Sequence, residues 1–208
     1  MASTTLEQPF WKVGKLVAGV DEAGRGCLAG PVVAAAVVLS PDSRHLCRQV
    51  QDSKQLSPAA REKLYDDITS QALAWGVGIA DVAMIDRQNI FRATLYAMQQ
   101  AVNALTVRVD HVFVDGPHLP PDFMEATPVV GGDVRSASIA AASIVAKVTR
   151  DRIMIALAAE YPHFGFDRHK GYPTAEHYRC LDRWGPTPVH RKSFLGKWHT
   201  RTRQQQAL

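Results

Sequence analysis

The pattern of apolar and polar positions divides the chain into short strands and longer helices. Residues 16–20 and 32–39 are apolar, rich in β-branched side chains and separated by a glycine-rich turn. This pattern predicts two neighbouring strands joined by a tight connection. Residues 75–79, where large apolar side chains alternate with small ones, predict a third strand. Short strands are also expected at 111–114, before an Asp-Gly-Pro turn, and around 128–130.

Three helices are predicted among these strands. Residues 57–70 begin with Ser-Pro, a typical helix start, and should form about three turns. Apolar residues spaced three and four apart over 85–105 predict one long helix. A further helix should begin at Ser138 or a neighbour and run to about Tyr161. Its first turns carry mostly alanine and serine, which favours tight packing against a sheet.

Strands followed by alternating helices and strands indicate an α/β protein with a mixed sheet. The length of 208 residues fits a single domain. Within it we expect a core over about residues 14–160, a basic helical extension over about 161–200 and a ragged tail at 201–208.

The composition, with 46% hydrophobic and 21% charged residues, is typical of a soluble globular protein. The longest aliphatic run, residues 32–39, is too short to span a bilayer, and residues 1–13 lack the pattern of a secretory leader. We therefore expect a monomeric cytoplasmic protein that does not bind membranes. Cys27, Cys47 and Cys180 have no C-x-x-C spacing, so we expect free thiols rather than disulfides or a zinc site.

Basic residues are concentrated at the C-terminal end. Residues 161–208 contain nine Lys and Arg but three acidic residues, a net charge of +6 against +4 for the whole chain. Aromatic residues are interleaved with these cations, and this combination suits a nucleic-acid backbone with its sugars and bases. The segment is equally consistent with a solvated basic surface.

The sequence V-D-E-A-G-R-G at residues 20–26 places two carboxylates before a Gly-Arg-Gly turn. Carboxylates bind divalent cations, while bare glycine backbone and an arginine fork suit a phosphate or a sugar. The segment indicates metal-assisted chemistry on a polyanion. By itself it is equally consistent with an exposed strand-to-turn junction, where Asp, Glu and Gly are common.

Four acidic residues are candidates for one metal site. Asp21 and Asp115 each end a predicted strand, and ligands in α/β sheets gather at the carboxyl ends of strands. Asp133 lies at the entrance to the small-faced helix. Glu22 can join Asp21 only if the strand has already turned, because successive strand residues point to opposite faces. Carboxylates without His or Cys select Mg²⁺ or Mn²⁺ over zinc.

Six ordered motifs resemble those of bacterial ribonuclease HII over nearly the whole chain. Besides V-D-E-A-G-R-G, they are D-S-K-x-L at 52–56, V-D-G at 114–116, G-D followed by S-I-A-A-A-S-I-V-A-K-V-T-R-D at 138–151, H-K-G-Y-P-T at 169–174 and H-R-x-S-F at 190–194. The resemblance implies a ribonuclease H-like fold, with a central mixed β-sheet flanked by helices and a small helical C-terminal extension.

The resemblance also implies an endoribonuclease of DNA replication and repair. Such an enzyme cuts the RNA strand of RNA–DNA hybrids and cuts 5′ to ribonucleotides embedded in duplex DNA. Two Mn²⁺ or Mg²⁺ ions would activate a water for in-line attack and stabilise the leaving oxygen, giving a 5′-phosphate and a 3′-hydroxyl. The catalytic metal ligands would be Asp21, Glu22, Asp115 and Asp133.

Substrate-binding residues follow from the same motifs. The backbone of Gly24, Arg25 and Gly26 would read the 2′-hydroxyl at the RNA-to-DNA junction. This group is both donor and acceptor, so it matches exposed amides and carbonyls. Tyr172 would pack against the adjacent sugar, and Lys54 would hold a phosphate.

The chain departs from the family pattern at two places. Cys27 and Leu28 follow the Gly-Arg-Gly turn where proline is usual, which would loosen the turn. Gly131 stands where lysine is expected, which removes a cation near the metals. Lys147 is a further candidate for DNA contact, although its position is as consistent with a solvated or salt-bridged lysine. His169 fits an exposed loop residue or a structural contact better than a general acid or base.

Two other classes of protein remain open on the sequence alone. One is a related nuclease of the same fold, such as ribonuclease HIII or a junction resolvase. The absence of an extra domain before residue 16 argues against ribonuclease HIII. The other is a hybrid-binding module without metals. The four retained carboxylates disfavour it, because a pure binder gains nothing from acid beside a polyanion.

Overall fold

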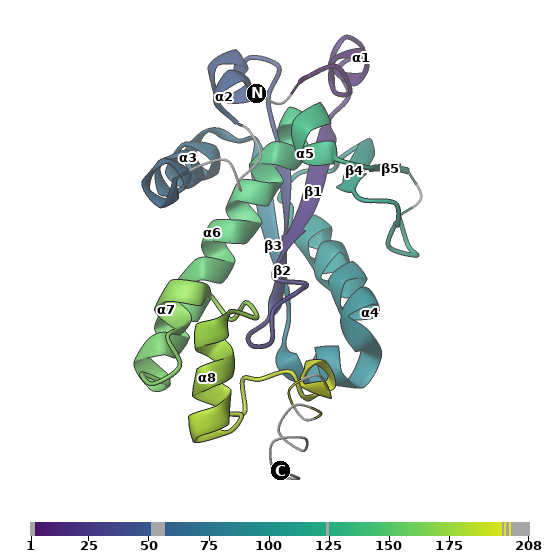
Figure 1. The fold of residues 1–208 in the computed structure, drawn as a ribbon. Coiled ribbons are helices and arrows are strands. Elements are labelled where there is room, and N and C mark those ends of the chain that lie inside the picture. The colour runs from purple at the N-terminus through teal and green to yellow at the C-terminus, as the bar shows by residue number, and fades with distance from the viewer. Residues whose placement is uncertain (1–2, 51–56, 124, 197, 199, 201–208) are drawn as a thin grey trace.

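A five-stranded mixed sheet forms the centre of the computed structural model (Figure 1). The described residues are 3–50, 57–123, 125–196, 198 and 200. The strands are β1 (Val17–Ala23), β2 (Val32–Val38), β3 (Ala74–Ala80), β4 (His111–Asp115) and β5 (Ala126–Val129). Their order is β3-β2-β1-β4-β5, with β1 antiparallel to β2 and parallel to β4. The predicted α/β architecture with a mixed sheet is confirmed.

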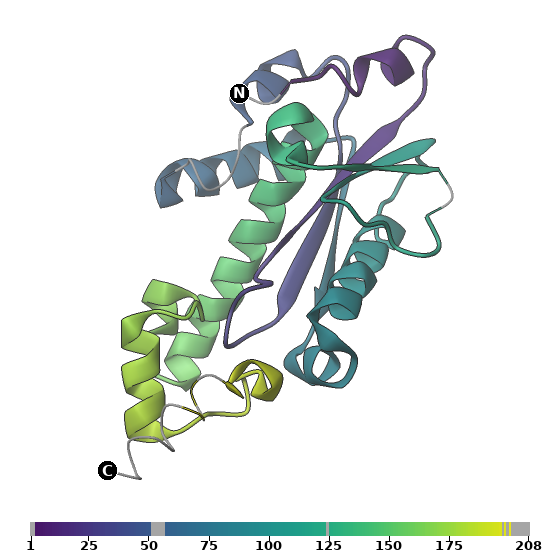
Figure 2. The same cartoon turned by 45° about the vertical axis from the view of Figure 1, so that its right-hand side comes forward.

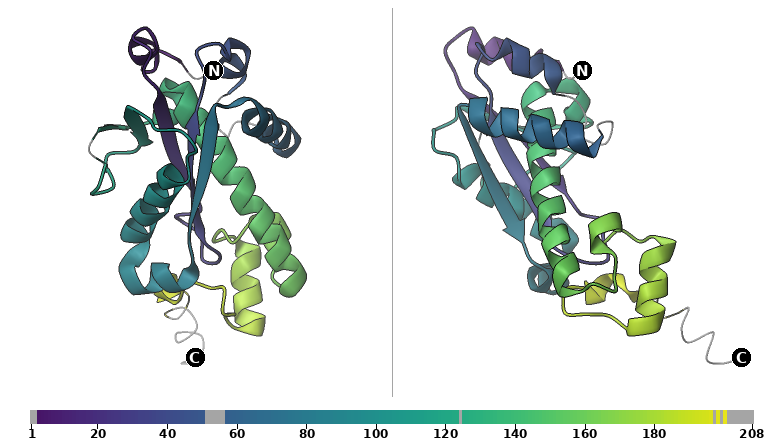
Figure 3. Two further views of the ribbon diagram at one scale, coloured as in Figure 1. Left: turned by 180° about the vertical axis from the view of Figure 1, so that it is seen from behind. Right: turned by 90° about the vertical axis from the view of Figure 1, so that its left-hand side faces the viewer.

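Helices cover both faces of this sheet. The long α6 (Ala137–Glu160) packs on β1 and β2 and is backed by α3 (Pro58–Gln71), while α4 (Val82–Asn103) covers the opposite face (Figure 2). The shorter helices are α1 (Gln8–Trp11), α2 (Arg44–Gln49), α5 (Gly132–Arg135), α7 (Phe166–His169), α8 (Ala175–Trp184) and the 3-10 turn η2 (Lys192–Phe194). Figure 3 shows α7 and α8 beside the C-terminal half of α6.

Strand β1 is longer than its hydrophobic pattern predicts. It continues past Val20 to Ala23, and Asp21 and Glu22 still pair with Ala35 and Ala34 of β2. The expectation that Asp21 ends the strand is therefore wrong, and the turn that was the condition for Glu22 to join Asp21 does not occur before Glu22. The apolar run stops where the strand reaches the acidic residues, whereas backbone pairing to β2 does not depend on side-chain polarity.

The predicted helices form with the expected boundaries, but one of them is interrupted. Ser57 caps α3 by accepting a bond from the Ala60 amide, and Ser136 caps α6. Within α4, Asn89 has φ 72° and ψ 163°, which are not helical values. Its side-chain oxygen accepts a bond from the Arg92 amide at 3.1 Å. Asn89 thus caps a second helical segment that the apolar spacing does not reveal.

The close approach of α6 to the sheet depends on Gly19 in β1. A Cβ atom at this position would overlap the backbone of Ser138 in the first turn of the helix. The alanines and serines of that turn and the next are buried, as their small size predicts. The contact brings Ser143, further along α6, to the carboxylate of Asp21.

Cys27, Cys47 and Cys180 are free, as expected from their spacing. None of the helices in the described part of the chain combines the length and the apolar character needed to cross a membrane. The predicted tail at 201–208 lies outside the described residues, and the division into core and extension stays a prediction.

We expect Gly19→Ala to lower the free energy of unfolding by about 1–3 kcal/mol or more, because the added methyl group forces α6 away from β1. Chemical denaturation monitored by circular dichroism measures this change. The matched control is Gly196→Ala, at an exposed helical position where a Cβ meets nothing within 4 Å. Equal stability of the two variants would contradict tight packing at Gly19.

Candidate active site

Two carboxylates come together where β1 and β4 run side by side. The last paired residues of these parallel strands are Val20 and Val114, so Asp21 and Asp115 follow on adjacent strands and on the same face. Asp21 is only 7% exposed. Asp115 accepts a hydrogen bond from the Gly132 amide at 2.7 Å. The structure thus brings together the two residues on which the predicted metal site depends most.

The electrostatics of this pair favour a bound cation. Burial raises the pKa of the Asp21 carboxyl well above its ordinary value, and the charges of Glu22 and Asp115 raise it further. Hydrogen bonds from the Glu22 amide and the Ser143 hydroxyl act in the opposite direction. In the described part of the chain, no Lys or Arg forms a salt bridge with Asp21 or Asp115. A divalent ion with oxygen ligands suits such a crowded, uncompensated charge.

Glu22 and Asp133 lie close by in the chain fold but in different settings. Glu22 forms an ion pair with Arg25, N to O 3.2 Å, and its charge is close enough to raise the pKa of the Asp21 carboxyl. Asp133 is in α5, directly after the Gly132 that binds Asp115. Among the described residues, no three His, Cys, Asp or Glu side chains form a ready-made metal cage. The ligand set of four carboxylates therefore stays a prediction.

The Gly-Arg-Gly turn is held by a buried arginine from the C-terminal end of the chain. Arg191 is fully buried and donates to the carbonyls of Gly24 (2.8 Å), Arg25 (2.9 Å) and Gly30 (2.9 Å). Burial lowers the pKa of Arg191 to about 10. The guanidinium stays charged at neutral pH, since this pKa is still well above 7.

A second buried arginine, Arg150 of α6, supports the same loop. It donates to the carbonyls of Ala29, Pro31 and Lys170 at 3.0–3.1 Å. Gly24 has φ +97°, and a Cβ atom there would collide with the Arg150 side chain. Only glycine adopts this positive φ without strain and also leaves room for the Arg150 side chain. Neither Arg150 nor Arg191 is among the site residues predicted from the sequence, although both stand inside family motifs, T-R-D and H-R-x-S-F.

Tyr172 lies against this turn. Its side chain is 39% exposed and its hydroxyl is hydrogen-bonded to the Cys27 thiol. The Lys147 ammonium lies 5.5 Å from the ring centroid. The neighbouring Gly171 carbonyl accepts a bond from the Leu28 amide at 2.8 Å. The tyrosine loop and the Gly-Arg-Gly loop are thus tied together through backbone and side chain.

Two departures from the family pattern have a structural setting. The Cys27 amide donates to the Gly24 carbonyl at 3.4 Å, a turn bond that proline lacks the N–H to make. Gly131 has φ +64°, a conformation that costs lysine more than glycine. The looser turn expected at Cys27 and the effect of the missing lysine at Gly131 stay predictions.

The remaining candidates have mixed outcomes. Lys147 forms a salt bridge with Asp151 at 2.7 Å, one of the alternatives considered for it. His169 is 8% exposed rather than exposed on a loop, and it is hydrogen-bonded to the Phe164 carbonyl at 2.6 Å. Its reading as a structural contact is therefore supported. Lys54 and its D-S-K-x-L motif lie outside the described residues.

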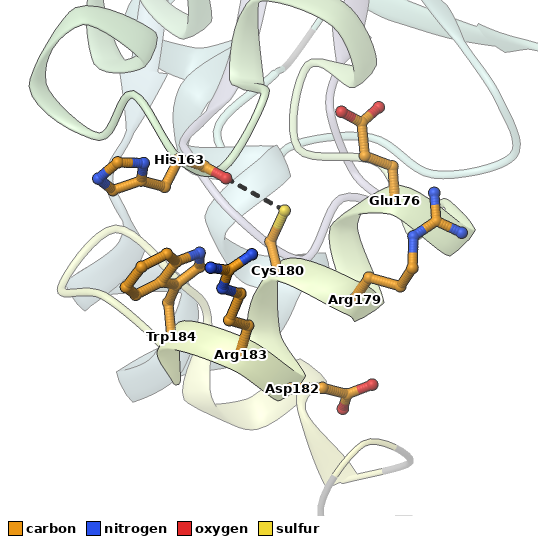
Figure 4. Close-up of a pocket in the computed structure, with 7 residues that line it drawn as sticks. All are labelled: His163, Glu176, Arg179, Cys180, Asp182, Arg183 and Trp184. Atoms are coloured by element: carbon orange, nitrogen blue, oxygen red, sulfur yellow. Dashed lines mark hydrogen bonds between the residues drawn. The ribbon is translucent and has the colours of Figure 1, made fainter.

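Two surface pockets differ in what lines them. A small one contains Arg25 and Asp115 together with Phe91 and His118, so the Gly-Arg-Gly turn and one carboxylate of the pair share a cavity. A larger one on α8 contains none of the predicted site residues (Figure 4). There Trp184 stacks on His163 with ring centroids 4.8 Å apart. The positions of the predicted site residues therefore favour the smaller cavity as part of the active site.

Comparison with known proteins identifies the family. The ribonuclease HII family model matches residues 18–197. Ribonuclease HII of Dechloromonas aromatica is 54% identical over 179 residues, which cover 86% of this chain and 90% of that protein. Ribonuclease HII of an Anaeromyxobacter species is 52% identical, and the match covers 90% of this chain but 59% of that longer protein.

Solved structures agree with this assignment. The ribonuclease H2 of Pyrococcus horikoshii superposes with a TM-score of 0.76 at 28% identity, covering 91% of this chain and 99% of that one. Bst-RNase HIII in complex with Mn²⁺ gives 0.71 at 18% identity, covering 92% and 71%, and so shares the fold. The chain belongs to the ribonuclease HII family. Its activity is that of a type 2 ribonuclease H, an endoribonuclease of RNA–DNA hybrids.

Without divalent ions, we expect Asp21→Asn to raise the melting temperature, by about 2–4 °C for each kcal/mol of repulsion removed. The gap to the wild type should narrow as the pH falls, because protonation of Asp21 removes the same charge. Added Mn²⁺ should stabilise the wild type more than the variant. Differential scanning fluorimetry with and without Mn²⁺ measures both effects.

The control for this experiment is Asp122→Asn, which removes an exposed carboxylate from a loop. Its melting temperature should follow that of the wild type under both conditions. A Mn²⁺ response in Asp21→Asn equal to that of the wild type would contradict metal binding at Asp21.

Proposed function

We propose that Asp21, Glu22, Asp115 and Asp133 hold two divalent ions, Mn²⁺ or Mg²⁺, at the end of β1 and β4. In this proposal the enzyme cuts RNA–DNA hybrids and also cuts 5′ to single ribonucleotides in duplex DNA. The products carry a 5′-phosphate and a 3′-hydroxyl. The observation that carries the proposal is the buried Asp21 beside Asp115, neither of which forms a salt bridge with Lys or Arg in the described part of the chain. Asp115 also shares a cavity wall with Arg25.

The donor set suits hard cations and hydrolysis without a side-chain nucleophile. When bound, paired divalent ions activate a water and stabilise the leaving oxygen. The protein's part is to fix the carboxylates in advance. Asp21 is oriented by the Ser143 hydroxyl and Asp115 by the Gly132 amide, so neither has to reorganise when an ion binds. The Mn²⁺ bound to the structurally similar Bst-RNase HIII supports this choice of metal.

The Gly-Arg-Gly turn is suited to reading a 2′-hydroxyl. The Gly24 carbonyl accepts bonds from Arg191 and from the Cys27 amide, whereas the Arg25 carbonyl accepts a bond from Arg191 and keeps a second lone pair. At Gly26 a Cβ atom would meet nothing within 4 Å, so the bare backbone has open space beside it. A backbone fixed by a buried arginine can discriminate strongly, because all-DNA would leave its polar groups unpaired.

Tyr172 is placed to pack against the sugar next to that hydroxyl. Its partly exposed ring stands on Cys27, and its loop is tied to the Gly-Arg-Gly loop. Lys147 beside the ring and Lys54 in the D-S-K-x-L motif would bind phosphates of the duplex. The basic residues of the C-terminal segment add sequence-independent attraction for the polyanion, and the enzyme would act as a monomer.

We expect Asp115→Asn to reduce the rate of cleavage by at least a thousandfold while leaving substrate affinity within a few fold, because the change removes a ligand charge but not a duplex contact. Gel-based cleavage of a duplex with one ribonucleotide, in Mn²⁺, measures the rate. Fluorescence anisotropy measures binding. Loss of binding in step with activity would count against the metal role.

Tyr172→Ala should reduce kcat/KM on a duplex with one ribonucleotide by about tenfold or more, since stacking of an aromatic ring is lost. Cleavage of a long RNA–DNA hybrid should fall less. Tyr172→Phe keeps the ring but not the hydroxyl that meets Cys27, so it should retain most of the preference. If Tyr172→Ala leaves the ratio of the two substrates unchanged, the junction role is wrong.

A further inference from the structure

Two buried histidines form a chain that ends on the backbone of Tyr172. His177 of α8 is fully buried and His190 is 1% exposed. Their Nε2 atoms are 2.9 Å apart. At one end, His190 Nδ1 is 2.9 Å from the amide nitrogen of Thr187. At the other end, His177 Nδ1 is 2.9 Å from the carbonyl oxygen of Tyr172.

The chemistry of the two ends fixes every proton in this chain. The Thr187 amide can only donate, so His190 Nδ1 accepts and its proton is on Nε2. The Thr187 hydroxyl, 2.8 Å from the same nitrogen, then donates to it as well. The Tyr172 carbonyl can only accept, so His177 Nδ1 donates and its Nε2 is free to accept. These two assignments are made independently, and they agree on the bond between the rings, in which His190 Nε2 donates and His177 Nε2 accepts.

The chain requires both rings to be neutral, and their surroundings favour that state. Burial lowers the pKa of His177 and of His190 to about 4. His169 stacks on His177 with ring centroids 4.4 Å apart. Its Nδ1 accepts the Gly171 amide, so it too carries its proton on Nε2, toward the Phe164 carbonyl. A second proton on either ring of the pair would place two N–H groups face to face.

We propose that His190 and His177 are positioning residues for ribonucleotide selection, acting through a one-way hydrogen-bond chain that sets the Tyr172 backbone. The inference rests on the role proposed above for Tyr172. This hydrogen-bond chain reaches the tyrosine loop at Tyr172, the residue whose ring is proposed to face the substrate. A shift of this carbonyl would also move the Gly171 carbonyl, which binds Leu28 beside the Gly-Arg-Gly turn.

Two substitutions of His177 separate the bonds of the chain. In His177→Asn the amide nitrogen occupies the place of Nδ1, so the variant can still donate to the Tyr172 carbonyl. In His177→Gln the amide group occupies the place of Nε2, so the variant can bond to His190 but not to Tyr172. Both variants remove the ring from the same buried position, which makes each the control for the other.

The readout is the ratio of kcat/KM for a duplex with one ribonucleotide to kcat/KM for a long RNA–DNA hybrid, in Mn²⁺. We expect His177→Gln to lower this ratio about tenfold, because the Tyr172 carbonyl then keeps only its bond from the Thr174 amide and loses the one from the histidine. His177→Asn should keep it within about threefold of the wild type, whatever the two variants lose in melting temperature. Nitrogen-15 NMR of the wild type should show His177 protonated at Nδ1 and His190 at Nε2.

Two results would overturn the inference. One is a proton on Nε2 of His177, since the chain would then run in the wrong direction. The other is a ratio in His177→Gln that equals that of His177→Asn while Tyr172→Ala lowers it. An unchanged ratio in Tyr172→Ala would instead refute the junction role of Tyr172, and the selection role of the histidines with it, while the NMR experiment still decides whether the chain exists.

Discussion

Backbone pairing between β1 and β4 keeps two acidic side chains closer together than their charges favour. Asp21 and Asp115 follow the last bridge of this parallel pair, and the burial of Asp21 leaves little water to screen its charge. The ladder, the amide of Gly132 and the hydroxyl of Ser143 hold them in place. The rest of the molecule serves this arrangement. The small residues of α6 allow the helix to reach Asp21, and the turn after β1 brings the Gly-Arg-Gly backbone to the same edge.

Two buried arginines lie near the acidic pair without forming salt bridges to it. Arg150 and Arg191 lie beneath the loop that follows β1, and in the described structure their hydrogen bonds go to carbonyls. Guanidinium groups bound to these carboxylates would neutralise the charge of the acidic site. Because both guanidinium groups bind backbone oxygens instead, the loop is held in place and Asp21 and Asp115 stay available to a cation.

The sequence predicts much of this arrangement, and what it misses has a physical reason. Apolar runs and helix caps locate the strands and helices, because burial and capping leave local patterns. The end of β1 was misplaced because pairing with β2 continues through Asp21 and Glu22, and the interruption at Asn89 was missed because it leaves the apolar spacing intact. Arg150 and Arg191 were overlooked because a buried arginine bound to carbonyls is identical in sequence to an exposed one.

The reach of Arg191 has a consequence for how the protein is made. The loop after β1 is synthesised early, yet three of its carbonyls, those of Gly24, Arg25 and Gly30, find their guanidinium partner 160 residues or more further along the chain. A nascent chain can pair the strands of the sheet before these carbonyls have their partner. Folding of the sheet and completion of this loop are thus separated in time, and a ribosome-bound fragment that ends before residue 191 would carry Asp21 and Asp115 without the guanidinium that holds the loop.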